Sequence, residues 1–114
     1  MINSPLKVVC FGDSITRGTI SASYVEMLDR RLSPFGYQFY NAGKNGDLAH
    51  NLLQRIQAVI DTRPDVVTLL VGTNDVIASL IHVEGWALRL AKRLPRQPSL
   101  DIYQEDLISL ITIL

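Results

Sequence analysis

The strongest constraint on the fold is a repeated order of strand-like apolar runs, each followed by a polar turn that contains glycine. The runs cover residues 6–11, 38–40 and 65–71, and stretches with helical spacing separate them. The first and third are rich in β-branched residues and almost continuously apolar, which is typical of parallel strands covered on both faces. Strands that alternate with helices predict a three-layer α/β/α, flavodoxin-like fold around a parallel sheet.

Capping signals mark where the first two long helices begin. Ser23 and Glu26 have the spacing of a capping box, in which the two side chains each satisfy a free backbone N–H, and the helix that follows should end before Pro34. Asp47 is the predicted N-cap of the second helix, and Pro64 closes that helix.

The C-terminal third has a weaker pattern. Residues 86–94 are predicted to form a helix with its apolar side chains inward and a solvated charged face outward. Two prolines then interrupt the chain, and Ser99 is placed to cap a last helix. The end of that helix, residues 107–114, is almost wholly apolar and lacks a stop signal. The predicted inward residues are Trp86, Leu90 and Leu94, and the predicted outward residues are Arg89, Lys92 and Arg93.

Length and composition limit the classes of function. The chain has 114 residues, of which 47% are hydrophobic, so one domain with a packed core is expected. The formal net charge is +0, which argues against nucleic-acid binding by a basic surface. No stretch reaches the roughly 20 apolar residues of a membrane span, and no signal peptide is evident, so a cytoplasmic location is expected unless a leader has been removed. Cys10, the single cysteine, should be a small buried apolar side chain.

Polar residues follow each predicted strand. In a doubly wound sheet, chemistry collects at the carboxyl ends of the strands, so these turns form the candidate site. Their sequences are Gly-Asp-Ser at 12–14, Asn-Ala-Gly at 41–43 and Gly-Thr-Asn-Asp at 72–75. In this order, over most of residues 6–76, they resemble the motifs of the SGNH (GDSL) hydrolase family, whose members cleave esters, thioesters and acyl groups from lipids and sugars.

The resemblance implies a catalytic role for three residues. Ser14 would be the nucleophile that attacks an ester carbonyl and forms an acyl-enzyme. The backbone N–H groups of Ser14 and Gly43 and the side-chain amide of Asn74 would stabilise the oxyanion. The expected substrate is a small ester or acylated molecule, and neither a metal nor an organic cofactor is required. All of this depends on one condition: the hydroxyl of Ser14 must face the amide of Asn74.

Each motif residue also has a purely structural interpretation. Ser14 could cap the turn that follows it, Gly43 could be an ordinary loop glycine, and Asn74 could form an Asx turn. Asp13 is interpreted as a turn former and not as an acid catalyst. Three motifs in the family's order, each after its own strand, favour the catalytic interpretation.

The sequence offers no convincing general base. The family's base is the histidine of an Asp-x-x-His motif near the C-terminus, and the last third of this chain has no such motif. Asp47 and His50 have the right spacing, but they lie at the start of the second predicted helix. His82 has no acidic residue three positions before it. We therefore expect a single domain over residues 1–114 that is incomplete at its C-terminus and has low hydrolase activity alone.

Two alternatives come from other functional classes. The hydroxyl-rich segment 14–19 follows the first strand and could cradle the phosphate of FMN in a flavodoxin-like protein, although this would leave Gly43 and residues 72–75 without a role. A non-catalytic binding or assembly module of the same fold is the other alternative. Its apolar C-terminus could then mediate self-association.

Overall fold

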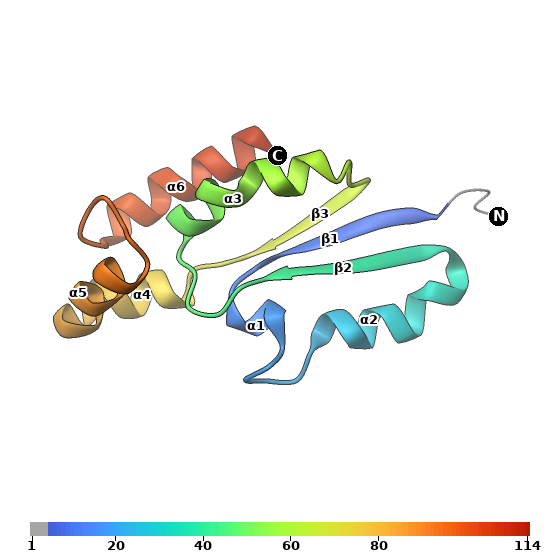
Figure 1. Ribbon diagram of the computed structural model, residues 1–114, viewed down its shortest axis with the longest axis horizontal. Helices are drawn as coiled ribbons and strands as arrows, with labels where there is room; N and C mark the ends of the chain where they lie inside the picture. Colours follow the sequence, from blue (N-terminus) through green and yellow to red (C-terminus); the bar gives the residue numbers. More distant parts are fainter. Residues whose placement is uncertain (1–4) are drawn as a thin grey trace. The chain divides into compact units, whose positions relative to one another are not determined.

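A parallel sheet of three strands in the order β2–β1–β3 organises the first part of the chain (Figure 1). The computed structural model describes residues 5–114. Strand β1 (Leu6–Gly12) pairs with β2 (Tyr37–Gly43) along its whole length and with β3 (Val66–Leu70) along its second part. The predicted parallel α/β fold is confirmed. Strand β2 is longer than the three predicted residues, because β1 offers it backbone partners as far as Gly12.

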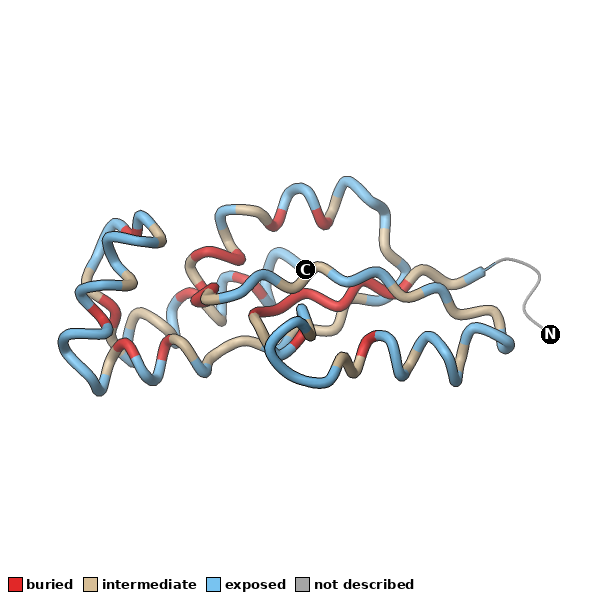
Figure 2. The backbone as a smooth tube through the Cα atoms, turned by 60° about the horizontal axis from the view of Figure 1, so that its bottom comes forward, coloured by how far each residue is buried: buried red, intermediate tan, exposed pale blue. Residues whose placement is uncertain are grey.

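Burial separates the central strand from the two edge strands. The last five residues of β1 are all buried, including Cys10 with no exposed surface, as predicted. In Figure 2 this strand is the longest continuous buried segment. Strands β2 and β3 have no buried residue, because each has a neighbour on one side only. The centre of the sheet therefore supplies the rigid core from which the first polar turn emerges.

The chain forms two compact units. The first contains the described residues up to Asn45 together with Gln57–Leu70, and the second contains Gly46–Ile56 and Val71–Leu114. All three strands belong to the first unit. Helix α3 (Ala49–Asp61) contributes its first part to the second unit and its last part to the first.

Three helical segments belong to the first unit: α1 (Ser14–Arg17), α2 (Tyr24–Leu32) and the short 3₁₀ helix η1 (Ser33–Phe35). The Ser23 hydroxyl accepts the backbone N–H of Glu26 at 3.2 Å, so the predicted cap of α2 is confirmed. The Glu26 carboxylate instead accepts a hydrogen bond from Arg30 at 2.6 Å. Arg30 lies one turn further along the helix. It is therefore close enough to compete for the Glu26 carboxylate with the second bond of a capping box, which would come from the backbone N–H of the N-cap residue.

The second unit is helical. Besides the start of α3, it contains α4 (Thr73–Leu80), α5 (His82–Ala91) and α6 (Leu100–Ile113). The Ser99 hydroxyl accepts the backbone N–H of Ile102 at 3.2 Å, which confirms the predicted cap of the last helix. Within residues 5–114, none of the helices combines the length and the hydrophobicity that crossing a membrane requires.

The predicted orientation of residues 86–94 is wrong in its main feature. Trp86 and Leu90 were expected to point inward, but they are 59% and 61% exposed, and only Leu94 is buried. Gly85 explains the orientation: a Cβ atom at this position would overlap the carbonyl oxygen of Ala78 in α4, so this side of α5 lies directly against α4. The three charged residues also differ from one another. Arg89 and Arg93 are exposed as predicted, whereas the Lys92 ammonium reaches a buried carboxylate.

Candidate active site

Asp13 shapes the turn that follows β1. Its side chain is buried, and its Oδ1 atom accepts the backbone N–H of Ile15 at 3.0 Å, so Asp13 caps α1. Its backbone carbonyl also accepts the N–H of Arg17 at 2.9 Å. The interpretation of Asp13 as a turn former is confirmed. Ser14 is therefore not needed as the cap, and that structural interpretation of Ser14 is wrong.

Ser14 is the first residue of α1 and is partly exposed. Within residues 5–114 its side-chain hydroxyl makes no hydrogen bond, while its backbone carbonyl accepts the N–H of Gly18 at 3.0 Å. The residue thus has a fixed backbone and a free hydroxyl. This combination is compatible with the predicted role of a nucleophile, which needs an oxygen that is held in place and makes no other bond.

Gly43 ends β2 directly beside the end of β1, since Gly12 and Gly43 are partners in the sheet. A Cβ atom at position 43 would overlap the backbone nitrogen of Arg17 and lie 2.8 Å from the carbonyl oxygen of Asp13. Glycine is therefore required here by the close approach of β2 to α1. Ser14 and Gly43 consequently lie at the carboxyl ends of two neighbouring strands.

Asn41 is a site residue whose role the sequence interpretation missed. Its Oδ1 atom accepts the backbone N–H of Gly43 at 2.9 Å, and its Nδ2 atom donates to the carbonyl of Thr16 at 2.9 Å. The signal was local: an asparagine often bonds the backbone two residues later. The Gly43 N–H, a predicted oxyanion donor, is therefore already held by a side chain that fastens β2 to α1.

Asn74 lies in the second unit, in the first turn of α4. Its Nδ2 atom donates to the backbone carbonyl of Asp47 at 3.0 Å. A side-chain amide has two N–H groups, so this bond leaves one of them for another acceptor. The predicted approach of the Ser14 hydroxyl to this amide connects the two units, and it stays a prediction.

Asp75, and not Asp47, bonds the backbone at the start of α3. Asp47 was the predicted N-cap of α3, but both oxygens of the Asp75 carboxylate accept the N–H of Ala49, at 3.2 and 3.1 Å. The buried Asp47 carboxylate instead accepts Arg55 Nε and Lys92 Nζ, each at 2.9 Å. The prediction for Asp47 was wrong because a carboxylate between two cations is better satisfied than at a helix end.

This ion-pair cluster also removes Asp47 as an orienting partner for His50. The carboxylate nearest to His50 Nδ1 is that of Asp106, with Oδ2 at 3.6 Å, which is too long for a hydrogen bond. Asp106 Oδ2 is buried and has no hydrogen-bond partner within residues 5–114. His82 is exposed at the start of α5. The Asp47–His50 pairing suggested by their spacing is therefore not formed.

Within residues 5–114, His50 lines a small pocket. Asp75 and Ser99 also line it, but this pocket of the second unit has room for about one water molecule, too little for an ester. Among residues 5–114, His, Cys, Asp and Glu side chains form no cluster of three or more that could hold a metal ion.

Tyr103, in α6, stabilises the turn after β3 by a hydrogen bond. Its hydroxyl donates to the Val71 carbonyl at 3.0 Å, immediately before the Gly-Thr-Asn-Asp segment. Burial raises the pKa of the Tyr103 phenol, and the negative charge of Asp75 raises it further. The phenol therefore keeps its proton, and with it the ability to donate this hydrogen bond, to higher pH than an ordinary tyrosine.

Solved structures similar to this chain are esterases and lipases. The acetyl xylan esterase AlAXEase is 27% identical with a TM-score of 0.68, over 94% of this chain and 51% of that one. A lipase/acylhydrolase from Enterococcus faecalis is 29% identical with a TM-score of 0.68, over 94% of this chain and 51% of that one. A catalytic mutant of Axe2, an acetylxylan esterase from Geobacillus stearothermophilus, is 28% identical with a TM-score of 0.68, over 97% of this chain and 55% of that one.

This chain thus spans about half the length of these structural relatives. A search of curated protein sequences gave no significant match. The model of the GDSL-like lipase/acylhydrolase family matches residues 10–112, which include all three polar turns. Together with the parallel sheet and the motif order, this match shows that the chain belongs to the GDSL-like lipase/acylhydrolase family.

Proposed function

We propose that this chain carries the nucleophile and the oxyanion-binding groups of a serine esterase. Ser14 Oγ would attack the acyl carbonyl, the alcohol would leave with a proton, and water would then release the acid from the acyl-enzyme. The observation that supports this proposal is that the helix after β1 is capped by Asp13 and not by Ser14. Asp13 caps α1, and the Ser14 hydroxyl is left unbonded within residues 5–114.

Three donors would share the oxyanion. The Ser14 N–H and the second N–H of the Asn74 amide are candidates, and the third is the Gly43 N–H. Because Asn41 Oδ1 now holds the Gly43 N–H, the Gly43 donor would have to turn partly from Asn41 towards the oxyanion. A bond formed more strongly in the transition state than in the resting enzyme lowers the activation barrier.

The substrate class we propose is a small acylated molecule, with acetylated sugars as the first compounds to test. Two of the structural relatives described above are acetyl xylan esterases. We expect low turnover from this chain alone, because the Asp47 carboxylate is held by Arg55 and Lys92 instead of by His50. His82 has no acidic residue three positions before it. Binding and oxyanion stabilisation without a base leave only a small part of the catalysis of such enzymes.

Labelling with a fluorophosphonate tests the nucleophile directly. We expect a single covalent adduct, located at Ser14 by peptide mass spectrometry and absent from Ser14→Ala. Ser33→Ala is the matched control, because Ser33 is an exposed serine at the start of another helix, and this variant should be labelled like the original protein. An adduct that persists in Ser14→Ala, or no adduct in the original protein, would refute an activated Ser14.

A further inference from the structure

The peptide group between Asp47 and Leu48 is held at both of its polar ends. Its carbonyl accepts the Asn74 amide at 3.0 Å, and its N–H donates to Asn51 Oδ1 at 3.0 Å. The two ends belong to one planar group, so they cannot turn independently. All four residues lie in the second unit. The acceptor that Asn74 bonds is therefore fixed from its far end by Asn51.

Lys92 ties this peptide group to the end of α5 in two ways. Its ammonium lies 2.9 Å from the buried Asp47 carboxylate, and its backbone carbonyl accepts Asn51 Nδ2 at 3.3 Å. The backbone N–H of Lys92 bonds the Leu88 carbonyl at 2.8 Å, so the helix sets its position. Arg55 also contacts the Asp47 carboxylate, at 2.9 Å, but it does so from α3. Lys92 thus joins α5 to the start of α3 through both of its polar groups.

Gly46 leaves room for the apolar stem of Lys92. A Cβ atom at position 46 would lie 3.0 Å from Lys92 Cε, and the φ angle of Gly46 is +80°. Another residue here would be strained and would press on the lysine. The Lys92 side chain is only 19% exposed. The contact is therefore a fitted one, unlike a surface ion pair whose side chains move freely in water.

The orientation of the Asn74 amide depends on the Asp47 carbonyl. A carbonyl oxygen can only accept hydrogen bonds, so Asn74 must turn its Nδ2 end towards Asp47 and its Oδ1 end away. The second N–H of the same nitrogen then points in a defined direction. A flipped amide would present Oδ1, which is an acceptor, to the oxyanion. The position of the Asp47 carbonyl therefore decides whether Asn74 is able to donate.

We propose that Lys92 is a positioning residue that holds the Asn74 amide, through Asp47 and Asn51, in the orientation that donates to the oxyanion. This inference rests on the proposed function, in which Asn74 is an oxyanion donor. Lys92 itself would not touch the substrate. Donors stabilise an oxyanion best when they are aimed in advance, and a displacement of about 1 Å costs about 10² in rate.

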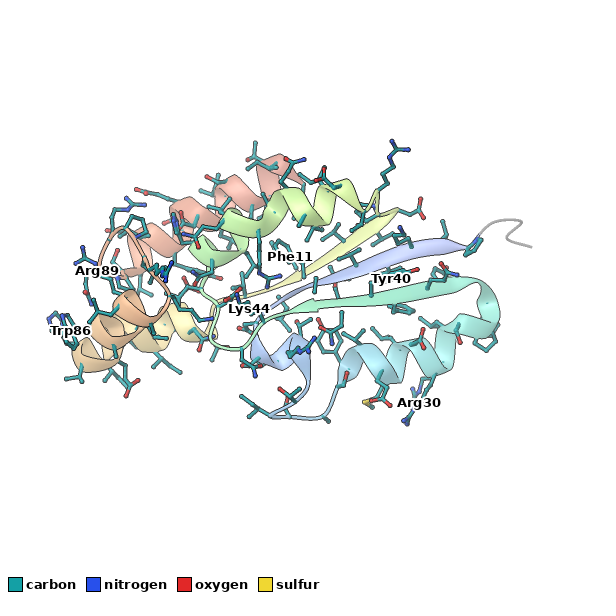
Figure 3. The ribbon with its side chains drawn as sticks, viewed as in Figure 1. Phe11, Arg30, Tyr40, Lys44, Trp86 and Arg89 are labelled. Atoms are coloured by element: carbon teal, nitrogen blue, oxygen red, sulfur yellow. The ribbon has the colours of Figure 1, made fainter. Side chains whose placement is uncertain are left out.

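Lys92→Met tests the proposal through the kinetics of fluorophosphonate labelling. It keeps the apolar stem and removes the ammonium, and it should slow labelling of Ser14 by about 10 to 10² fold. Lys92→Arg keeps a cation and should be labelled faster than Lys92→Met. Arg89→Met is the matched control, because it also removes one positive charge near the end of α5. Arg89 is exposed, and in Figure 3 its side chain extends outward from the helix, so its labelling rate should be unchanged.

A double-mutant cycle separates positioning from general destabilisation. In the Asn74→Ala background, Lys92→Met should change the labelling rate by less than about twofold, because the amide that Lys92 holds is gone. A purely destabilising effect would slow labelling equally in both backgrounds. Circular dichroism verifies that each variant keeps its helices. Lys92→Gln retains a neutral donor and provides the same test if Lys92→Met does not fold.

The side-chain amide of Asn74 also reports on its own position, independently of any reaction. Its pair of signals in a heteronuclear NMR spectrum of nitrogen-labelled protein is identified as the pair that Asn74→Ala lacks. Lys92→Met should shift this pair, because the Asp47 carbonyl loses part of its support. Arg89→Met should leave the pair where it is.

The results distinguish failure of this inference from failure of the proposed function. Unshifted Asn74 signals in Lys92→Met, an unchanged labelling rate of Lys92→Met, or equal slowing in both backgrounds would each overturn the role of Lys92, while slow labelling of Asn74→Ala still supports the oxyanion site. If Asn74→Ala were labelled at the original rate, the oxyanion role of Asn74 would fail, and the role of Lys92 would fail with it.

Discussion

The turn after β1 and the turn after β3 both start a helix, yet they use their polar residues differently. In the first turn Asp13 caps the helix, and the Ser14 hydroxyl has no hydrogen-bond partner within residues 5–114. In the second turn the Asn74 amide bonds the Asp47 carbonyl, and the Asp75 carboxylate bonds the Ala49 N–H. In the first turn the helix cap and the unbonded hydroxyl belong to different residues, whereas in the second turn both motif side chains bond the backbone near the start of α3.

This difference has a consequence for mutagenesis. A substitution at the free residue of the first turn should change chemistry and leave stability unaffected. Substitutions in the second turn should change stability as well, because each removes a hydrogen bond that holds the start of α3. Four substitutions test this comparison of the two turns, from the largest expected effect to the smallest.

Asn74→Ala should slow the fluorophosphonate reaction of Ser14 by about 10² to 10³, the usual effect of losing one oxyanion donor. It should also lower the free energy of unfolding by about 1 kcal/mol, because the Asp47 carbonyl loses a donor. Labelling kinetics and urea unfolding measure the two effects separately. Gln57→Ala is the control, since its amide bonds Asp61 within α3. Equal labelling rates for Asn74→Ala and the original protein would exclude Asn74 from the oxyanion site.

Asp75→Ala should lower the free energy of unfolding by about 1.5–3 kcal/mol, since it removes a charged acceptor from the backbone at the start of α3. Asp75→Asn keeps an acceptor oxygen and should lose less. Urea unfolding of the three proteins provides the comparison. If Asp75→Ala were as stable as the original protein, the second turn would not carry the structural role assigned to it.

Local patterns in the sequence predicted much of the fold. The strands were visible as apolar runs, and Ser23 and Ser99 marked the true starts of α2 and α6, because a cap bonds an N–H only three residues away. The position of Ser14 just after β1 and of Gly43 at the end of β2 is also a local feature, because each depends only on its own strand. Features that depend on residues close in sequence were therefore accessible without a structure.

Features that depend on distant residues were not accessible. Asp47 looks like an N-cap, and one of the two cations that its carboxylate binds, Lys92, is 45 positions away. The face of α5 was misassigned because an apolar stripe usually points inward, whereas here the close contact of Gly85 with Ala78 decides the orientation. A glycine in the middle of a helix, facing small residues on a neighbouring helix, was the available signal for this contact.

Tyr103→Phe should lower the free energy of unfolding by about 1 kcal/mol, because the Val71 carbonyl loses its donor. The folded-state pKa of Tyr103 is raised by burial and then by Asp75, so the folded protein binds this proton more tightly than the unfolded chain. The corresponding stability is fully present below pH about 10 and is lost as pH rises through the folded-state pKa. Urea unfolding at increasing pH should show this loss in the original protein and in the control Tyr40→Phe, but not in Tyr103→Phe. An identical pH dependence in all three proteins would contradict this role of Tyr103.

Ser14→Ala should change the free energy of unfolding by less than about 0.5 kcal/mol, even though it should remove all fluorophosphonate labelling. Its matched control is Thr16→Ala, two residues later in α1. The Thr16 side chain is fully buried, with Oγ1 2.8 Å from the Tyr24 hydroxyl, and its loss should cost about 1–2 kcal/mol. If Ser14→Ala were destabilised as much as Thr16→Ala, the Ser14 hydroxyl would have a structural partner. The two turns would then be alike, and the free hydroxyl would no longer support a nucleophile at this position.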